Sequence, residues 1–177
     1  GGIKTIEDIK TLFSLGVEKV ILNTTLQAKR EIITQAAELY GAQSIIVSID
    51  IKKSLFGSYK ACFLSGKKNN DTNLEEFAQK IESLGAGEIL LNNIDKEGTF
   101  SGLDYKLINS LSKALKIPLI ACGGTNSISD MLEGVKAGAS AIAAGSFFAY
   151  KNNDTQSILI NYPSQKELTE QLYLKLN

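Results

Sequence analysis

The sequence Gly-Gly-Ile-Lys-Thr-Ile-Glu-Asp at residues 1–8 returns as Gly-Gly-Thr-Asn-Ser-Ile-Ser-Asp at residues 123–130. The match continues without a gap at an offset of 122 residues, which places Asn23 on Gly145 and Thr24 on Ser146. Each copy predicts a glycine turn, a short helix, a glycine stop and an apolar strand that ends in small polar residues. The chain therefore contains the same strand–turn–helix unit twice.

A Gly-Gly turn leaves backbone N–H groups uncovered by side chains, and the helix that follows adds partial positive charge at its N-terminus. Both features suit a bound phosphate. The alternative is that the units are ordinary strand–turn–helix elements repeated by the architecture. Two copies in register, each with a hydroxyl or amide side chain after the next strand, favour phosphate binding. The pair predicts a ligand that carries a phosphate at each end.

Composition excludes several classes of protein. The chain has 177 residues, of which 44% are hydrophobic, enough for a single domain over residues 1–177. Its 19 basic and 19 acidic residues cancel, and no apolar run is long enough to span a bilayer, so neither a nucleic-acid partner nor a membrane is expected. Cys62 and Cys122 are the two cysteines, which favours a cytoplasmic protein over a disulfide scaffold.

The chain has no histidine, which excludes Ser-His-Asp and Cys-His catalysis and any histidine-bound metal. No metal site and no cofactor are expected. Carboxylates, amides, lysines and backbone dipoles must carry any chemistry.

Helical and strand patterns alternate along the chain. The expected helices cover residues 6–15, 28–40, 74–84, 104–115, 128–137 and 165–176. The expected strands of the main sheet cover residues 19–22, 44–50, 88–91, 117–121 and 141–144. Residues 58–64 predict a strand of a small hairpin, residues 67–71 a polar loop, and residues 151–163 a polar excursion.

Alternating strands and helices fit both an open doubly wound sheet and a closed (β/α)8 barrel. The offset between the glycine turns spans four units, half of eight, which favours the barrel. An intact barrel has about 250 residues, and the one methionine is Met131. We expect a (β/α)8 TIM barrel truncated at its N-terminus, of which this chain is the C-terminal part with about five strands. Such a piece cannot close by itself, so alone it is expected to be inactive and to associate or to belong to a longer chain.

In such barrels the active site lies at the carboxyl ends of the strands. Asp50 ends the most apolar strand and is the candidate for general acid–base chemistry. The alternative for Asp50 is that it only accepts hydrogen bonds from the following loop. The other residues expected at these strand ends are Asn23, Thr24, Lys52, Asn92, Glu97, Gly98, Cys122, Gly123, Gly124, Gly145 and Ser146.

Seven segments become recognisable together, at residues 1–3, 19–24, 49–52, 65–68, 85–91, 95–104 and 120–124. They resemble HisF, the cyclase subunit of imidazole glycerol phosphate synthase, from residue 1 to about residue 150. The Ile-Asp-x-Lys pattern at residues 49–52 and the Gly-Ala-Gly-Glu-Ile-Leu-Leu stretch at residues 85–91 favour the cyclase over related isomerase barrels. The resemblance implies a barrel of the ribulose-phosphate-binding type.

The resemblance also implies a heterodimer with a HisH-type glutaminase docked on the N-terminal face of the barrel. Ammonia from that partner would cross the barrel and react with a bis-phosphate substrate, giving imidazole glycerol phosphate and an aminoimidazole ribonucleotide. Asp50 matches one of two catalytic aspartates, and Lys19 and Glu88 match members of a charged ring at the ammonia entrance. One phosphate would be bound by Gly2, Asn23 and Thr24, the other by Gly98, Gly124, Gly145 and Ser146, with Lys52, Asn92, Glu97 and Gly123 as further substrate-binding candidates.

Some residues depart from the family's pattern. The family usually has a second aspartate where Glu97 stands, Thr-Ser where Asn92 and Asn93 stand, and serine where Cys122 stands. The tail at residues 156–164 looks more like HisF paralogues that deliver ammonia for amidation or amidination of cell-surface sugars. That paralogue is one alternative function, and a non-catalytic scaffold that only binds the glutaminase is another.

Overall fold

A computed structural model describes residues 2–54, 57–63, 66, 68–70, 72–150, 158, 160 and 162–176. Within these residues, seven strands form one sheet. Five of them are parallel neighbours in the order β1 (Val20–Leu22), β2 (Ile45–Lys53), β5 (Glu88–Asn93), β6 (Leu119–Cys122) and β7 (Ala141–Ala143). The predicted parallel α/β sheet with five barrel strands is confirmed.

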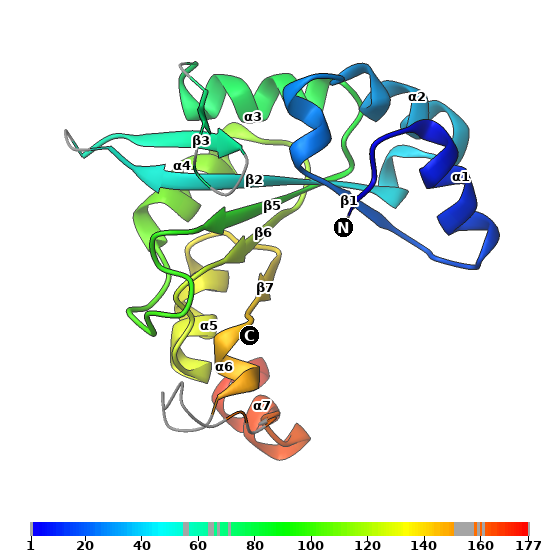
Figure 1. Cartoon of the computed structure of the whole chain (residues 1–177). Coiled ribbons are helices and arrows are strands. Elements are labelled where there is room, and N and C mark those ends of the chain that lie inside the picture. The colour runs from blue at the N-terminus through cyan, green and yellow to red at the C-terminus, as the bar shows by residue number, and fades with distance from the viewer. Residues whose placement is uncertain are drawn as a thin grey trace.

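The sheet is curved, and the helices that connect its strands lie along its outer side (Figure 1). These helices are α2 (Glu31–Tyr40), α3 (Leu74–Ser83), α4 (Tyr105–Ala114) and α5 (Ile128–Lys136), with α1 (Ile6–Ser14) packed against α2. This is the arrangement of consecutive units of a (β/α)8 barrel, in which strands curve inside a layer of helices.

The strand β2 shows how the sequence separates the two faces of the sheet. Ile45, Val47, Ile49 and Ile51 alternate along it and are buried in the core beneath the helices. Ser48, Asp50 and Lys52 alternate with them and are only partly buried on the opposite face. Because side chains alternate between the faces of a strand, the same strand contributes apolar side chains to the core and polar side chains to the opposite face.

A hairpin interrupts the alternation, as predicted. The strand β3 (Tyr59–Phe63) runs antiparallel to the end of β2, pairing Cys62 with Asp50, and β4 (Lys68–Asn69) pairs with β3. It lies on the same edge of β2 as β1, because β1 pairs only with residues 45–47 and leaves the rest of that edge open. Residue 64 of the predicted hairpin strand and residues 67 and 71 of the predicted loop lie outside the described residues.

Several predicted boundaries were wrong by a few residues. The helix expected at 28–40 begins at Glu31, after a 3-10 helix at Thr24–Gln27, since no Ser, Thr, Asp or Asn side chain caps it earlier. The helix expected at 165–176 is α7 (Gln165–Gln171) followed by a 3-10 helix at Tyr173–Lys175. A short helix α6 (Ser146–Ala149) was not predicted. Of the expected excursion, residues 151–157, 159 and 161 lie outside the described residues.

Capping explains why the two repeat helices begin where the sequence predicts. The side chains of Thr5 and Ser127 accept hydrogen bonds from the backbone N–H groups of Asp8 and Asp130.

None of the helices in the described part of the chain has both the length and the apolar character needed to cross a membrane.

Candidate active site

Four neighbouring strands bring a row of polar side chains to one level of the sheet. Asp50 on β2 is paired with Asn92 on β5, Asn92 with Cys122 on β6, and Asp50 with Cys62 on the hairpin strand β3. Asp50, Asn92 and Cys122 lie at the carboxyl ends of their parallel strands, as predicted. Side chains at one level of adjacent parallel strands point to the same face of a sheet, so Asp50, Asn92 and Cys122 form a row on the inner face.

Asp50 is held within this row. The side-chain amide of Asn92 donates from Nδ2 to Asp50 Oδ1 at 2.9 Å, and the Cys62 thiol donates to the backbone oxygen of Asp50 at 3.3 Å. The other end of the Asn92 amide, Oδ1, is buried without a hydrogen-bond partner among the described residues. The carboxylate is therefore oriented by a neutral donor, while the row keeps an unused acceptor.

Burial and the charges of two carboxylates raise the pKa of the Cys122 thiol. Burial raises the pKa of the Cys122 thiol to about 11, with further contributions from the charges of Glu97 and Asp50. The thiol is therefore protonated at neutral pH, and Cys122 is not a thiolate nucleophile. The same interactions show that Glu97 and Asp50 both act electrostatically on this part of the inner face.

The first glycine turn borders an open pocket of about 600 Å³. Gly2, Asn23 and Thr24, the three residues predicted to bind one phosphate, all line this pocket. Gly2 has a φ of +84°, and Asn23 donates from Nδ2 to Ser48 Oγ at 3.4 Å. Lys4 and Lys29 line the same pocket and place two positive charges beside the turn. The turn and the following strand end are thus brought together as predicted.

The second glycine turn is closed in by its surroundings. Gly123 and Gly124 have φ values of +101° and +95°. A Cβ atom at Gly123 would lie 2.4 Å from Asn93 O, and one at Gly124 would lie 2.6 Å from Gly102 O. Neither contact is possible for a real side chain, so both positions require glycine. The backbone N–H of Gly102 donates to Gly124 O at 2.8 Å, which joins this turn to the loop after β5.

That loop lines a second pocket, which in this structure has no space for a water molecule. Gly98, Gly124, Gly145 and Ser146, the residues predicted to bind the second phosphate, line it together with Glu97, a further substrate-binding candidate. Ser146 donates from Oγ to Glu97 Oε1 at 3.1 Å, so a carboxylate lies across the pocket in this structure.

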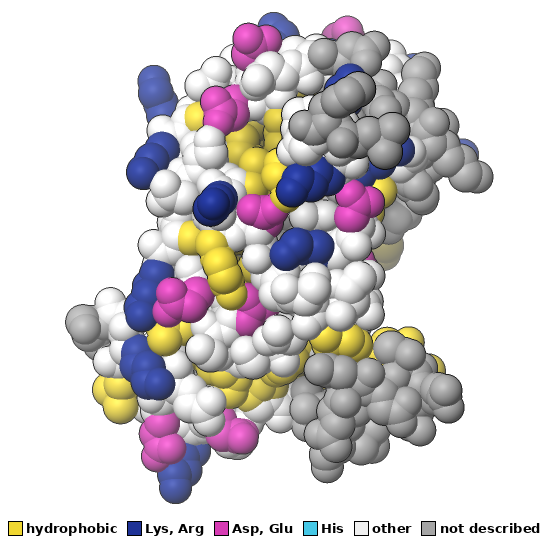
Figure 2. All heavy atoms as spheres, turned by 90° about the vertical axis from the view of Figure 1, so that its left-hand side faces the viewer, with side chains coloured by type: hydrophobic (Ala, Val, Ile, Leu, Met, Phe, Trp, Pro, Cys, Tyr) yellow, Lys and Arg dark blue, Asp and Glu magenta, His cyan; other side chains and the backbone are white. Residues whose placement is uncertain are grey.

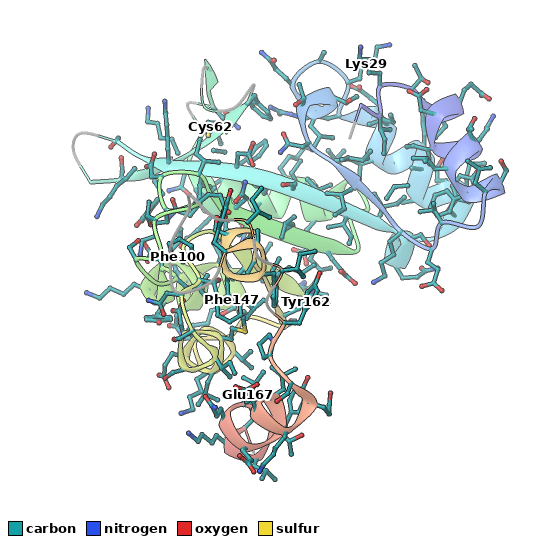
Figure 3. The ribbon with its side chains drawn as sticks, turned by 60° about the horizontal axis from the view of Figure 1, so that its bottom comes forward. Lys29, Cys62, Phe100, Phe147, Tyr162 and Glu167 are labelled. Carbon is teal, nitrogen blue, oxygen red and sulfur yellow. The ribbon has the colours of Figure 1, made fainter. Side chains whose placement is uncertain are left out.

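The sequence did not single out every residue of the two pockets. Phe100, Thr125 and Phe147 line the second pocket, and Lys4 and Lys29 the first. Figure 3 shows Lys29 far along the sheet from Phe100 and Phe147, which lie close together. A repeat alignment could have found Thr125, because it occupies the position of Ile3 directly after the glycine pair.

The remaining predicted residues lie near the hairpin or at the amino ends of the strands, away from the row of Asp50, Asn92 and Cys122. Lys52 donates from Nζ to Gly66 O at 2.8 Å and so joins β2 to the hairpin. Lys19 and Glu88 form an ion pair at the amino ends of β1 and β5. This pair is at the opposite end of the strands from Asp50, as a gate at the other mouth of a barrel would be.

The face at the carboxyl ends of the strands is electrically mixed. Figure 2 looks onto it and shows acidic and basic side chains interspersed, without a large area of one sign. Among the residues drawn in colour, such a mixed surface lacks the continuous positive area that an extended polyanion needs.

A partial (β/α)8 arrangement with a row of polar side chains at the carboxyl ends of its strands, between two glycine-turn pockets, is typical of barrel enzymes. Residues 1–155 match the family described as histidine biosynthesis protein. The chain belongs to this family.

Individual relatives make the likeness more specific. The chain is 42% identical over 179 residues to the "Putative imidazole glycerol phosphate synthase subunit hisF3" of Vibrio vulnificus, covering 98% of this chain and 67% of that protein. It is 38% identical over 169 residues to a hisF2 protein of the same description from Pseudomonas aeruginosa, covering 95% and 67%. It is 41% identical over 147 residues to imidazole glycerol phosphate synthase subunit HisF of Sulfurisphaera tokodaii, covering 83% and 59%. The chain is thus HisF-like and spans about two thirds or less of these relatives.

Proposed function

We propose that the chain is the greater part of a cyclase subunit of imidazole glycerol phosphate synthase. It acts as one domain in the cytoplasm and uses ammonia from a HisH-type glutaminase to convert a bis-phosphate substrate. The observation that carries this proposal is the oriented carboxylate of Asp50, which lies on the inner face of the sheet between two pockets built on related glycine turns.

Each pocket would hold one phosphate of the substrate. Gly2, Asn23 and Thr24 bind one end, supported by the charges of Lys4 and Lys29. At the other end the backbone around Gly98, Gly124 and Gly145 and the hydroxyl of Ser146 bind the second phosphate after Glu97 turns away. Two anchored ends stretch the substrate along the row and place its middle beside Asp50.

Asp50 would then transfer a proton during ring closure. Its Oδ1 is occupied by the Asn92 amide, which leaves Oδ2 for the substrate or for ammonia. The unpartnered Oδ1 of Asn92 would accept from an N–H or O–H group of the substrate, and the ammonium of Lys52 supports the same edge of the row. Gly123 allows the backbone of β6 to approach β5 at this point.

Ammonia would reach this row from the amino ends of the strands. The Lys19–Glu88 ion pair lies there and would form part of the entrance used by the glutaminase product. Replacing Lys19 with alanine should lower glutamine-driven turnover in the complex, whereas turnover with free ammonia should stay within about twofold. Equal loss with both nitrogen sources would show that the pair is only structural.

The decisive experiment measures ammonia-dependent turnover of the bis-phosphate intermediate of histidine biosynthesis by the full-length protein. Asp50→Asn should lower the rate by about 10²–10⁴-fold, the usual contribution of a general acid or base, with little change in KM. Glu133→Gln, which removes an exposed carboxylate paired with Lys136 on α5, is the matched control and should stay fully active. No turnover by the unmodified protein, or full activity of Asp50→Asn, would contradict the proposal.

One observation favours a second candidate function, delivery of ammonia for amidation or amidination of cell-surface sugars. The hisF3 and hisF2 relatives match 98% and 95% of the chain, whereas the HisF relative of Sulfurisphaera tokodaii matches 83%. The hisF3 and hisF2 relatives therefore match a larger share of the chain than this HisF relative does. Failure to complement a histidine auxotroph, together with retained glutaminase stimulation, would favour this candidate.

A further inference from the structure

One buried hydroxyl group in the second pocket has no hydrogen-bond partner among the residues that the structure describes. Thr125 is 4% exposed and lines the pocket with Glu97, Gly98, Gly124 and Ser146. Its Oγ1 is buried and has no hydrogen-bond partner among the residues that the structure describes. A buried hydroxyl without a partner is unfavourable, and most buried polar groups in proteins avoid this state.

The repeat shows that the turn itself does not need this hydroxyl. Ile3 occupies the equivalent position in the first copy, directly after Gly2, and an isoleucine side chain carries no polar atom. Both copies nevertheless form a positive-φ glycine turn followed by a capped helix. Thr125 is therefore dispensable for the local fold, and the cost of its unpaired hydroxyl needs another explanation.

We propose that Thr125 is a phosphate-binding and specificity-determining residue, which donates its hydroxyl proton to the substrate phosphate held at the Gly124 turn. The inference rests on the proposed function and extends its second phosphate site by one side chain. Ser146 and Thr125 both line the pocket and supply two hydroxyl donors, and Gly98, Gly124 and Gly145 carry no side chain that covers the backbone. The ligand breaks the bond from Ser146 to the exposed Glu97 side chain and takes both hydroxyl donors.

The number of donors in the second pocket also favours phosphate as the ligand. A tetrahedral phosphate offers several acceptor oxygens, so it can bind two hydroxyl groups and backbone N–H groups at once. A planar carboxylate has only two acceptor oxygens, so it would satisfy fewer of the hydroxyl and backbone donors at once than a phosphate does. The first pocket has Ile3 at this position and relies on Lys4 and Lys29, so Thr125 acts at one end of the substrate only.

The test uses inorganic phosphate and the full-length chain, with amide NMR signals reporting on each turn. Thr125→Val removes the hydroxyl and keeps the shape. It should weaken binding at Gly124 and Ser146 about tenfold or more, the expected loss of one hydrogen bond to a charged group, without affecting Gly2 and Thr24. The melting temperature without phosphate should stay the same or rise, because an unpaired buried hydroxyl has been removed.

Two further variants serve as controls. Thr125→Ser retains the hydroxyl and should bind within about threefold of the unmodified protein. Thr169→Val alters a hydroxyl on α7 that donates to Gln165 O, and should leave both turns unchanged. If Thr125→Val does not fold, Thr125→Ala replaces it in the same comparison.

Two results would overturn the inference. Unchanged affinity at Gly124 and Ser146 in Thr125→Val would show that the hydroxyl does not bind phosphate. A melting temperature lowered by several degrees in Thr125→Val, but not in Thr125→Ser, would show that the hydroxyl is structural. If the unmodified protein responds to phosphate at neither turn, the proposed function fails together with the inference.

Discussion

The two glycine turns share a sequence pattern but differ in their surroundings. Gly2 is exposed beside an open pocket, and a Cβ atom there would meet nothing within 4 Å. Gly124 is buried against the loop after β5, and the side chain that crosses its small pocket is acidic. The first turn thus has space and two lysines, whereas the second has close packing and a carboxylate. Local sequence determines the turn, and the neighbouring unit determines how tightly it is held.

The two helix-capping aspartates show the same contrast. Asp8 accepts from the backbone N–H groups of Lys4 and Thr5, within its own unit. Asp130 is 4% exposed and accepts from the N–H groups of Leu103 and Asn126 and from the Tyr105 hydroxyl, so it also binds the preceding unit. Equivalent residues in a repeat can therefore differ in structural importance.

Alanine in place of each glycine should give the largest difference between the turns. Gly124→Ala combines a left-handed backbone with a collision against Gly102 O, and should cost about 3 kcal/mol or more in free energy of unfolding. Gly2→Ala meets open space and should cost about 1–2 kcal/mol from backbone strain alone. Urea denaturation of both variants measures the difference. Equal costs would show that the packing around Gly124 does not stabilise the protein.

Asparagine in place of each aspartate should give the next largest difference. Asp130→Asn replaces one of the two accepting oxygens with an N–H₂ group, so at least one of the three donors loses its acceptor, which should cost about 1–3 kcal/mol. Asp8→Asn should lower the melting temperature only slightly, because water can replace the bonds at this exposed cap. Thermal unfolding followed by circular dichroism compares the two. A larger effect at Asp8 would contradict the described role of Asp130.

Sequence reasoning predicted the fold and the site to different extents. The apolar run at residues 44–50 predicted a parallel strand that ends at Asp50, because a run of apolar residues is visible in the sequence itself, whereas the polar inner face with Ser48 and Lys52 appeared only in the structure. The bond from Asn92 to Asp50, the Glu97 carboxylate across the second pocket and the burial of Asp130 were not predictable. Each depends on the register between strands or on a loop conformation that one sequence pattern does not specify.

Charge changes in the two pockets should act in opposite directions on phosphate binding. Glu97→Gln removes a negative charge beside Ser146 and should tighten inorganic phosphate at the second turn about fivefold, for roughly 1 kcal/mol of repulsion in a solvated site. Lys29→Ala should weaken phosphate at the first turn by a similar factor, and both effects should shrink in high salt. Titrations at two ionic strengths test this. Weaker phosphate binding in Glu97→Gln would mean that the side chain helps to bind the ligand.

Alkaline pH should affect the second turn through groups packed near it. Burial raises the pKa of Cys122 to about 11 and raises that of Tyr105, which also donates to Asp130. Both groups keep their protons in the folded chain after they lose them in the unfolded chain. Their stabilising contribution is therefore complete below about pH 9 and is lost as the pH rises towards 11 and beyond.

Melting temperatures from pH 8 to 11 check this expectation. Cys122→Ser should make the decline between pH 9 and 11 shallower, because a serine hydroxyl does not ionise in this range. An identical decline in the variant would show that the Cys122 thiol does not contribute.

The central claim is that the two turns bind the two ends of one bis-phosphate ligand. The most direct measurement titrates the bis-phosphate histidine intermediate into the isotope-labelled full-length protein and follows the amide signals of Gly2, Thr24, Gly124 and Ser146. All four amide signals should shift along one saturation curve. The bis-phosphate ligand should bind at least about 10²-fold more tightly than inorganic phosphate, because its second end binds at a high effective concentration. Shifts confined to one turn, or an affinity no higher than that of inorganic phosphate, would contradict this claim.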